Sequence, residues 1–478
     1  MADLQDATIL STFDFWAWCD AQGFVVSGDI SDVQLSSLST DTRTLQQGAL
    51  FVALVGERFD AHDFLENAYN QGACAALVSK SQGSFDAPDG MILIFVPDTL
   101  LALQMLAAAL WQELLERGVK TISLTGSNGK TTSKELLRAL CSFRHKVHAT
   151  YGNYNNHIGV PLTICATPCS AEVVILEMGA SKRGDIKELT EIAPAHARLI
   201  CSIGYAHLEG MGGLDGVRQT KSEIFIGSNS NTVAVVPDDE FESLIPEDFQ
   251  GQALSFGGST GDVRAAVLGQ NSEGMKVQLS FADATADVVV DVSLQGEHNA
   301  RNLAACVAIV RGLGEAMSED ELGNALNSLV IPGGRSEVLR HGDLLFLNDS
   351  YNANPSSMLA SFQAFMGWSE EFVQGQGLPR IAVIGQMAEV GPESKNWHLE
   401  VARRMVDTDG LDALVFVGDY AHEMKVEAEK QRGQVEVIAS ENLKDVALWL
   451  TKQGRGVIFL KASRSARLER LIELIQDG

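Results

Sequence analysis

Apolar residues in the middle of the chain alternate between short continuous runs and longer stretches with helical spacing. The runs have the length of buried strands, and the stretches between them have the length of helices. Strands that alternate with helices in this way indicate a mainly parallel sheet covered by helices. The pattern predicts strands at 121–125, 173–177 and 199–203, and helices at 133–143 and 185–192.

The same alternation appears on both sides of this central part. Before it, the pattern predicts strands at 49–55, 75–78 and 91–96, a helix at 64–70, and a helix at 99–117 that ends at Gly118. After it come alternating segments at 276–281 and 287–293, which suit an antiparallel edge, then a helix at 299–313 and strands at 380–384, 413–417 and 456–460.

The length of the chain and a turn-rich segment suggest where it divides. One hydrophobic core rarely serves 478 residues. The helix at 99–117 leads into the central part, and Pro332-Gly333-Gly334 marks a second boundary. We therefore predict three α/β domains, comprising residues 1–97, 98–331 and 332–478.

Composition narrows the class of protein. The chain is 45% apolar with a formal net charge of -26, which suits a globular protein and argues against a nucleic-acid partner, since phosphate backbones require a basic face. Its seven cysteines lack CxxC spacing, which indicates reduced thiols rather than disulfides or a zinc site.

No apolar run approaches the roughly 20 residues of a membrane span, and residues 1–6 carry two acids and no Lys or Arg, unlike a targeting peptide. We expect a cytoplasmic protein without membrane insertion.

A phosphate-binding loop is predicted where the strand at 121–125 gives way to the following helix. The segment reads Thr125-Gly126-Ser127-Asn128-Gly129-Lys130-Thr131-Thr132. Its glycines let backbone N–H groups approach phosphates, Lys130 reaches the terminal phosphates, and the Thr131 hydroxyl can bind Mg²⁺. The general motif has glycine at position 124, where this chain has Leu124. The segment indicates an ATP-using enzyme, and its alternative interpretation is a solvated Gly-Asn turn.

Of four other polar features, the first three have two interpretations each. Glu177 ends a buried strand, where a carboxylate suits the Mg²⁺ of a nucleotide, or it is a solvated acid. The loop at 151–157 offers amides for a polar sugar or peptide, or is an ordinary turn. His207 is a second metal ligand or, as lone histidines more often are, structural. Lys221 has the spacing of a surface helix lysine.

Taken in order, these segments resemble the Mur ligases, the ATP-dependent enzymes that form amide bonds in peptidoglycan precursor synthesis. The resemblance covers nearly the whole chain. The segments that carry it are TGSNGKTT, LEMGAS around Glu177, GYAHLEGMG around His207, KSEIF from Lys221, GEHNARNLAA at 296–305 and GGRSEV around Arg335.

Other segments resemble one branch of that family. These are NDSYNANP at 348–355, Asp41-Thr42-Arg43 and GERFDAHDF at 56–64, which are similar to the branch that adds D-alanyl-D-alanine to UDP-N-acetylmuramoyl-tripeptide. The DNPR-type signature of the sibling that adds the third peptide residue is absent from the sequence.

The resemblance implies a fold and a role for each residue. The fold has a UDP-substrate-binding domain, a central P-loop mononucleotide-binding parallel sheet, and a C-terminal Rossmann-like domain that closes over the site. Lys130, His207 and Lys221 would be catalytic. Thr131 and Glu177 would hold one Mg²⁺ and His207 a second, which Lys221 would help to bind if it is carbamylated as in several relatives. The nucleotide would contact Gly126, Asn128, Gly129, Lys130, Thr131, Thr132, Asn299, Asn302, Arg335 and Asp349. The other substrates would contact Thr42, Arg43, Asn153, Asn155, Asn156, Tyr351, Asn352, Asn354 and Ser356.

The implied reaction uses ATP and Mg²⁺ to activate the tripeptide carboxylate as an acyl phosphate, which the amine of D-alanyl-D-alanine then attacks. Two rival interpretations remain at this point. A folylpolyglutamate-synthetase-like ligase shares the loop and the chemistry, and a nucleotide-dependent switch would also use a phosphate loop and a mobile domain. The sequence leaves the third peptide residue open between diaminopimelate and lysine, and we expect a monomer.

Overall fold

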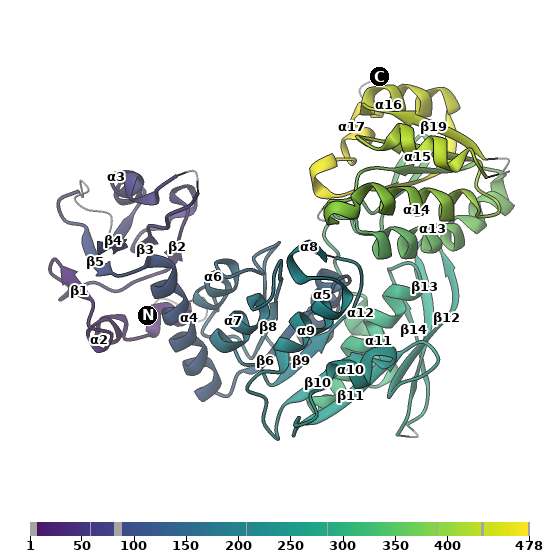
Figure 1. Ribbon diagram of the computed structural model, residues 1–478. Helices are drawn as coiled ribbons and strands as arrows, with labels where there is room; N and C mark the ends of the chain where they lie inside the picture. The colour runs from purple at the N-terminus through teal and green to yellow at the C-terminus, as the bar shows by residue number, and fades with distance from the viewer. Residues whose placement is uncertain are drawn as a thin grey trace.

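The computed structural model describes residues 7–57, 59–80, 88–206, 208–283, 285–388, 390–431 and 435–476. The strands in these ranges form three sheets, which follow one another along the chain and lie in three successive parts of the molecule (Figure 1). Most neighbouring strands are parallel, so the predicted α/β class is confirmed. The domain boundaries after residues 97 and 331 stay a prediction.

The first sheet has the strand order β1-β5-β4-β3-β2. Its pairs are parallel except for β1 with β5. One face packs against α3, and the other packs against α4. The elements are α1 Ile9–Thr12, α2 Phe15–Ala21, β1 Val25–Ser27, β2 Leu38–Ser39, β3 Ala49–Val52, α3 Leu65–Asn70, β4 Ala73–Ser79, β5 Ile92–Val96 and α4 Thr99–Glu116.

Helix α4 connects the first sheet to the central one. Its buried leucines, among them Leu103 and Leu110, share one core with the first sheet and with α6 (Gly159–Cys165) and α7 (Asp185–Ile192) of the central part. Gly118 follows the helix with a φ of +78°, a conformation that glycine adopts without strain, so the predicted helix end is confirmed.

The central sheet has the strand order β14-β13-β12-β11-β10-β9-β6-β8-β7. It is parallel from β7 to β12, and β12, β13 and β14 are antiparallel, which confirms the predicted antiparallel edge. The strands are β6 Lys120–Thr125, β7 Val147–Ala149, β8 Val173–Glu177, β9 Ala197–Ile200, β10 Val233–Pro237, β11 Gln252–Gly257, β12 Val263–Asn271, β13 Gly274–Phe281 and β14 Val288–Val292. The remaining helices are α5 Lys130–Ser142, α8 Leu208–Met211, α9 Leu214–Ser222, α10 Phe241–Leu244, α11 Glu297–Gly312 and α12 Glu319–Leu326.

The two largest errors in the predicted bounds of the central part both fall at the phosphate loop. The strand expected at 199–203 ends at Ile200, because residues after it leave the sheet to bond the loop: Ser127 N donates to Ser202 O at 2.9 Å. The helix expected from 133 begins at Lys130, so the lysine and Thr131 form its first turn.

The third sheet has the strand order β15-β16-β20-β17-β18-β19 and is parallel except for β15. Helices α13 to α15 cover one face, and α16 and α17 cover the other. The elements are β15 Glu337–His341, β16 Asp343–Asn348, α13 Pro355–Gln376, β17 Arg380–Ile384, α14 Ser394–Val406, β18 Ala413–Val417, α15 Ala421–Ala428, β19 Glu436–Ser440, α16 Leu443–Gln453, β20 Arg455–Lys461 and α17 Arg470–Gln476.

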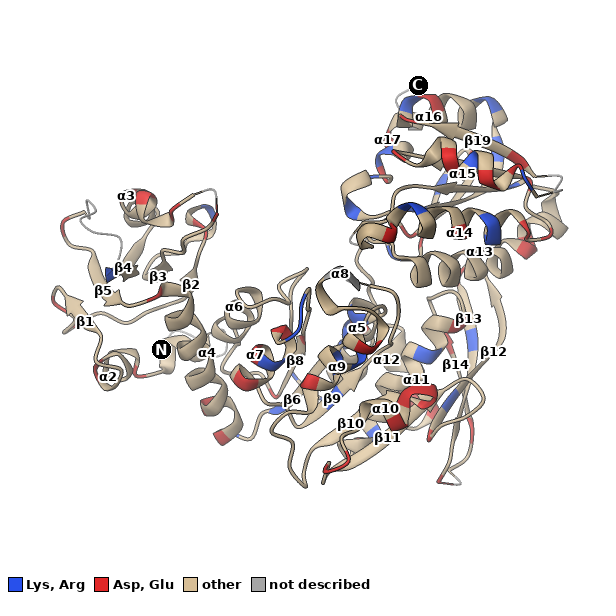
Figure 2. Cartoon of the chain, viewed as in Figure 1, with Lys and Arg blue, Asp and Glu red and all other residues tan. Residues whose placement is uncertain are grey.

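The surface mixes charges of both signs. In Figure 2, acidic and basic positions are interspersed over all three parts of the molecule. None of the described helices is long and apolar enough to cross a membrane.

Candidate active site

A cavity of about 1190 Å³ lies between the central sheet and the third sheet. Its walls come from the loops that follow β6, β8 and β9, from α11, and from the loops that precede α13. Ligands of α/β proteins bind outside the carboxyl ends of parallel strands, where these loops meet. Most of the predicted site residues line it: Asn128, Gly129, Lys130, Thr131, Thr132, Asn153, Asn155, Asn156, Glu177, Asn299, Asn302, Arg335, Asp349, Tyr351, Asn352 and Ser356.

The phosphate loop is held by the strand end beside it. Asn128 N donates to Ser202 Oγ at 2.9 Å, and that hydroxyl donates to Asn128 O at 3.0 Å. Lys130 opens helix α5, and its Nζ donates to Gly126 O at 2.7 Å. The loop therefore presents the N-terminus of a helix and an ammonium group on one side of the cavity, a combination that suits an anion.

Gly129 and Asn302 are in close contact at the bottom of this loop. Gly129 has a φ of +81°, and a Cβ at this position would lie 2.6 Å from Asn302 Oδ1. Asn302 in turn donates through Nδ2 to Asn299 Oδ1 at 3.1 Å. The two asparagines of α11 therefore form a polar floor against which only glycine fits.

Glu177 and Thr131 lie together on the opposite side of the loop. Thr131 Oγ1 donates to Glu177 Oε2 at 3.0 Å, and Asn155 Nδ2 donates to Oε1 at 2.8 Å. The carboxylate is only 2% exposed, so the interpretation of Glu177 as a solvated acid was wrong. Thr131 and Asn155 are both neutral, and a buried carboxylate beside a hydroxyl is suited to a cation.

The asparagine loop lines the cavity beside Glu177. Asn153, Asn155 and Asn156 all contribute to the wall. Asn156 has a structural task as well, because its Oδ1 accepts from the N–H groups of Ile158 and Gly159 at the start of α6. The segment is thus more than a surface turn, since Asn155 bonds the buried carboxylate of Glu177 and its neighbours line the cavity.

Lys221 is not the surface lysine that its spacing indicated. Lys221 is 2% exposed, because the face of helix α9 that carries Val217 and Lys221 packs inward. Burial, together with the nearby charge of Lys130, lowers the pKa of Lys221 to about 7. Lys221 does not line the cavity.

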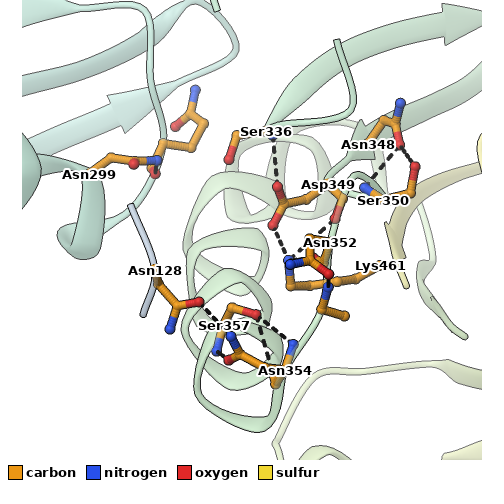
Figure 3. Close-up of polar contacts among 12 residues, drawn as sticks. Asn128, Asn299, Ser336, Asn348, Asp349, Ser350, Asn352, Asn354, Ser357 and Lys461 are labelled. Atoms are coloured by element: carbon orange, nitrogen blue, oxygen red, sulfur yellow. Dashed lines mark hydrogen bonds and ion pairs between the residues drawn. The ribbon is translucent and has the colours of Figure 1, made fainter. Parts of the chain in front are cut away.

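On the other side of the cavity, two loops of the third sheet are joined to each other (Figure 3). Ser336 N donates to Asp349 Oδ1 at 3.2 Å, and Tyr351 N donates to Gly334 O at 3.0 Å. The guanidinium carbon of Arg335 lies 3.9 Å from the centre of the Tyr351 ring. Arg335 and Asp349 are thereby placed side by side on the cavity wall.

Among the described residues, the contacts between the third sheet's part and the central part include two hydrogen bonds and one ring contact. Asn354 Nδ2 donates to Asn128 Oδ1 at 2.7 Å (Figure 3), and Tyr205 N donates to Ser356 Oγ at 3.2 Å. The rings of Tyr205 and Trp397 have centres 4.7 Å apart. Asn354 itself is buried and does not line the cavity.

Sequence reasoning missed several residues that line the cavity, among them His298 of α11 and Lys461 of β20. Burial lowers the pKa of His298 to about 4, against an opposing effect of Asp349, so the imidazole is neutral near pH 7. Lys461 ends the apolar strand β20, and a lysine closing a buried run was the one available signal.

The structure leaves some predicted residues outside the cavity. Thr42 and Arg43 lie in a short helical turn beside the first sheet, where Arg43 pairs with Asp41 at 2.6 Å. Gly126 lies behind the loop, where a Cβ would approach Cys201 and Ser202 to 3.0 Å. His207 lies outside the described residues.

Family models match all three parts of the chain. A Mur ligase family catalytic domain matches residues 34–111, a Mur ligase middle domain matches 124–310, and a Mur ligase glutamate ligase domain matches 334–464.

Curated relatives match over nearly their whole length. The chain is 33% identical to a UDP-N-acetylmuramoyl-tripeptide–D-alanyl-D-alanine ligase of Bacillus subtilis over 457 residues, 95% of each chain. It is also 33% identical to the enzyme of that name from Escherichia coli, covering 95% of this chain and 97% of the relative.

Solved structures also match most of the length of this chain. MurF of Acinetobacter baumannii superposes with a TM-score of 0.83 at 29% identity, covering 96% of this chain and 97% of that one. MurF of Thermotoga maritima, solved in complex with ADP, gives 0.77 at 28% identity, covering 92% and 97%. A folylpolyglutamate synthase of Mycobacterium tuberculosis shares the fold at a TM-score of 0.61 and 17% identity, covering 78% and 93%.

Proposed function

This chain belongs to the Mur ligase family, and from that premise we propose that it is an ATP-dependent ligase that joins D-alanyl-D-alanine to UDP-N-acetylmuramoyl-tripeptide. One observation carries the proposal: the phosphate loop, the buried Glu177 and the polar loops before α13 line a single cavity. Relatives named for this activity are 33% identical over nearly the whole chain. The product is the UDP-N-acetylmuramoyl-pentapeptide of peptidoglycan synthesis.

The reaction proceeds in two steps. An oxygen of the tripeptide carboxylate attacks the γ-phosphorus of ATP, the bond to the bridging oxygen breaks, and ADP leaves. The amine of D-alanyl-D-alanine then attacks the carbonyl carbon of the acyl phosphate, the carbon–oxygen bond to phosphate breaks, and the nitrogen loses its proton. Lys130 and the N-terminus of α5 face the negative charge that both steps concentrate in the cavity.

The cavity between the two parts also protects the intermediate. Acyl phosphates react with water, so the contacts of Asn354 with Asn128 and of Ser356 with Tyr205 favour the amide by holding the third sheet's part over the loop. The UDP end of the substrate would lie against Thr42 and Arg43 on the first sheet, and the peptide would reach from there to Glu177.

Mg²⁺ suits the residues present. Thr131 and Glu177 supply a hydroxyl and a buried carboxylate, and oxygen ligands are what Mg²⁺ prefers. Among the described residues no three His, Cys, Asp or Glu side chains gather as a metal site, so nucleotide phosphates and water would complete the coordination. His207 would hold a second Mg²⁺. The metal would neutralise phosphate charge and polarise the γ-phosphoryl group.

Lys221 is the proposed site of carbamylation. A pKa of about 7 leaves much of the amine neutral at physiological pH, and only the neutral amine can add CO₂. The product is an anion placed near Lys130, whose charge contributes to the lowered pKa. Intact-mass measurement with and without bicarbonate tests this assignment: an absent adduct together with bicarbonate-independent activity would rule it out.

Dipeptide-dependent phosphate release tests the main proposal. Mg-ATP and UDP-N-acetylmuramoyl-tripeptide are supplied with and without D-alanyl-D-alanine, and the pentapeptide product is identified by mass. We expect release only when all substrates are present, and a loss of about 100-fold to 1000-fold in Lys130→Ala. Lys444→Ala, which changes an exposed lysine of α16, is the control and should behave as wild type.

The other outcomes separate the rivals. Phosphate release that ignores the dipeptide would leave an ATPase or a nucleotide switch. Release that requires a folate and glutamate would instead indicate the folylpolyglutamate-type ligase. We further propose that the protein acts in the cytoplasm as a monomer. Its seven cysteines are free in the structure, which suits a reducing compartment.

A further inference from the structure

Lys461 is a buried cation beside the cavity, and the proposed reaction gives it no role. It is 2% exposed and ends β20, between β16 and β17. Strand alternation places it on the same face as Val457 and Phe459, which pack in the core beneath α13. Lys461 therefore lies under the loop that connects β16 to α13.

The ammonium group of Lys461 is fully engaged by that loop. Nζ donates to Asp349 Oδ2 at 2.6 Å, to Asp349 O at 3.3 Å and to Asn352 O at 3.1 Å (Figure 3). A lysine has three N–H donors, and these three bonds use them all. Because the bonds reach both ends of the segment 349–352, they fix its shape.

The fixed segment in turn holds Arg335. Tyr351, in the middle of the segment, carries the guanidinium group on its ring at 3.9 Å. The second oxygen of Asp349 accepts from Ser336, the residue next to Arg335. Arg335 Nε is buried without a hydrogen-bond partner among the described residues, so the stack on Tyr351 and the neighbouring backbone bond are what orient this side chain.

We propose that Lys461 is a positioning residue that aims Arg335 at the phosphates of the nucleotide through the segment Asp349–Asn352. This proposal rests on the proposed function only in taking the cavity as the nucleotide site. Lys461 does not itself contact substrate, because its donors are used within the protein. It holds the guanidinium group of Arg335 in a fixed position opposite the phosphate loop.

ADP binding measured by calorimetry tests the proposal without relying on turnover. Lys461→Met keeps the length of the side chain and removes its charge and its donors. We expect the dissociation constant for ADP and the KM for ATP to rise about 10-fold to 100-fold, as when a hydrogen bond to a charged group is lost. The KM for the UDP-linked tripeptide should stay within about 2-fold of wild type, whereas a loss of folded protein would lower kcat for all substrates alike. Lys444→Met, an exposed lysine in the same part of the chain, is the matched control.

A double-mutant cycle with Arg335 shows whether Lys461 acts through it. If it does, Lys461→Met adds less than about 2-fold to the weakening of ADP binding already caused by Arg335→Ala. Independent, multiplicative effects overturn the proposal, and so does an unchanged ADP dissociation constant in Lys461→Met. If Lys461→Met does not fold, Lys461→Gln, which retains a donor, takes its place with the same expectations. Wild-type protein that binds ADP but forms no pentapeptide would contradict the proposed function and leave the cycle valid.

Discussion

The two walls of the cavity are built in different ways. The wall of the central part is centred on one continuous segment, the phosphate loop, whose shape follows from Gly129 at a φ of +81° and from the helix that begins at Lys130. The wall of the third sheet's part is assembled from Arg335, Asp349 and Lys461, which lie far apart in the sequence and meet only at the edge of the sheet.

The walls also treat buried charge differently. On the third sheet's side, the partial burial of Asp349 would raise its pKa, but the charge and hydrogen bond of Lys461 outweigh this and the pKa lies below its ordinary value. Behind the phosphate loop, Lys221 is buried near the like charge of Lys130, and its pKa falls. Asp349 and Lys461 therefore neutralise each other within the protein, whereas the charge of Lys221 is left for a ligand or a modification to balance.

Gly129→Ala should have the largest effect on this comparison. The new Cβ would lie 2.6 Å from Asn302 Oδ1, so the loop or the floor must move. We expect ADP affinity to fall about 100-fold or more, the scale of an ångström displacement in a site. Gly118→Ala is the matched control, because Gly118 also has positive φ but nothing lies within 4 Å of its added Cβ. It should lose about 1–2 kcal/mol of stability and no affinity. Equal affinity losses would show that backbone strain, and not the contact with Asn302, shapes this wall.

Lys221→Met should have the next largest effect, on stability and with a marked pH dependence. The pKa of about 7 in the folded protein lies below the ordinary 10.5, so between these values the unfolded chain holds a proton that the folded chain has released. Wild-type stability attributable to this group therefore rises with pH from 7 to 10.5, and its cost is greatest below pH 7. Removing the lysine should raise the free energy of unfolding by a few kcal/mol at pH 6, at about 1.4 kcal/mol per pKa unit, and by much less at pH 9.

Urea unfolding at the two pH values measures this difference. The samples are kept free of bicarbonate, because a carbamate would change the charge of the group. A stabilisation that is the same at pH 6 and pH 9 would mean that Lys221 is charged and balanced in the folded protein. The contrast with the neutralised Asp349–Lys461 pair would then disappear.

Asn354→Ala should have the smallest effect of the three. Asn354 caps helix α13 by accepting from Ser357 N at 2.9 Å, and it also donates to Asn128 of the phosphate loop. Asn442 caps α16 by accepting from Asp445 N at 3.0 Å and is a matched control without that second contact. Both alanine variants should lose about 1 kcal/mol of stability. Only Asn354→Ala should raise the KM for ATP, by about 2-fold to 5-fold, the worth of one hydrogen bond. A KM equal to that of Asn442→Ala would mean that the two walls are independent.

Much of the fold was predictable because its signals are local. The strands at 173–177, 380–384 and 413–417 were predicted with the bounds observed, since buried parallel strands form unbroken apolar runs between polar turns. The strand predicted at 199–203 failed at its end because Cys201 and Ser202 are apolar or small, yet they leave the sheet to support the phosphate loop. Composition does not distinguish a residue that pairs with a strand from one that pairs with a loop.

The phosphate loop, the strand that ends in Glu177 and the order of the α/β elements could be read from local sequence, because each depends on neighbours a few residues away. Three features emerge only when the chain is folded: Lys221 is buried, Asn354 bonds the phosphate loop, and Lys461 joins Asp349 beneath Arg335. The reason is physical: burial and charge pairing depend on which elements pack together, and a lysine on a helix or at a strand end has the same local pattern in either environment.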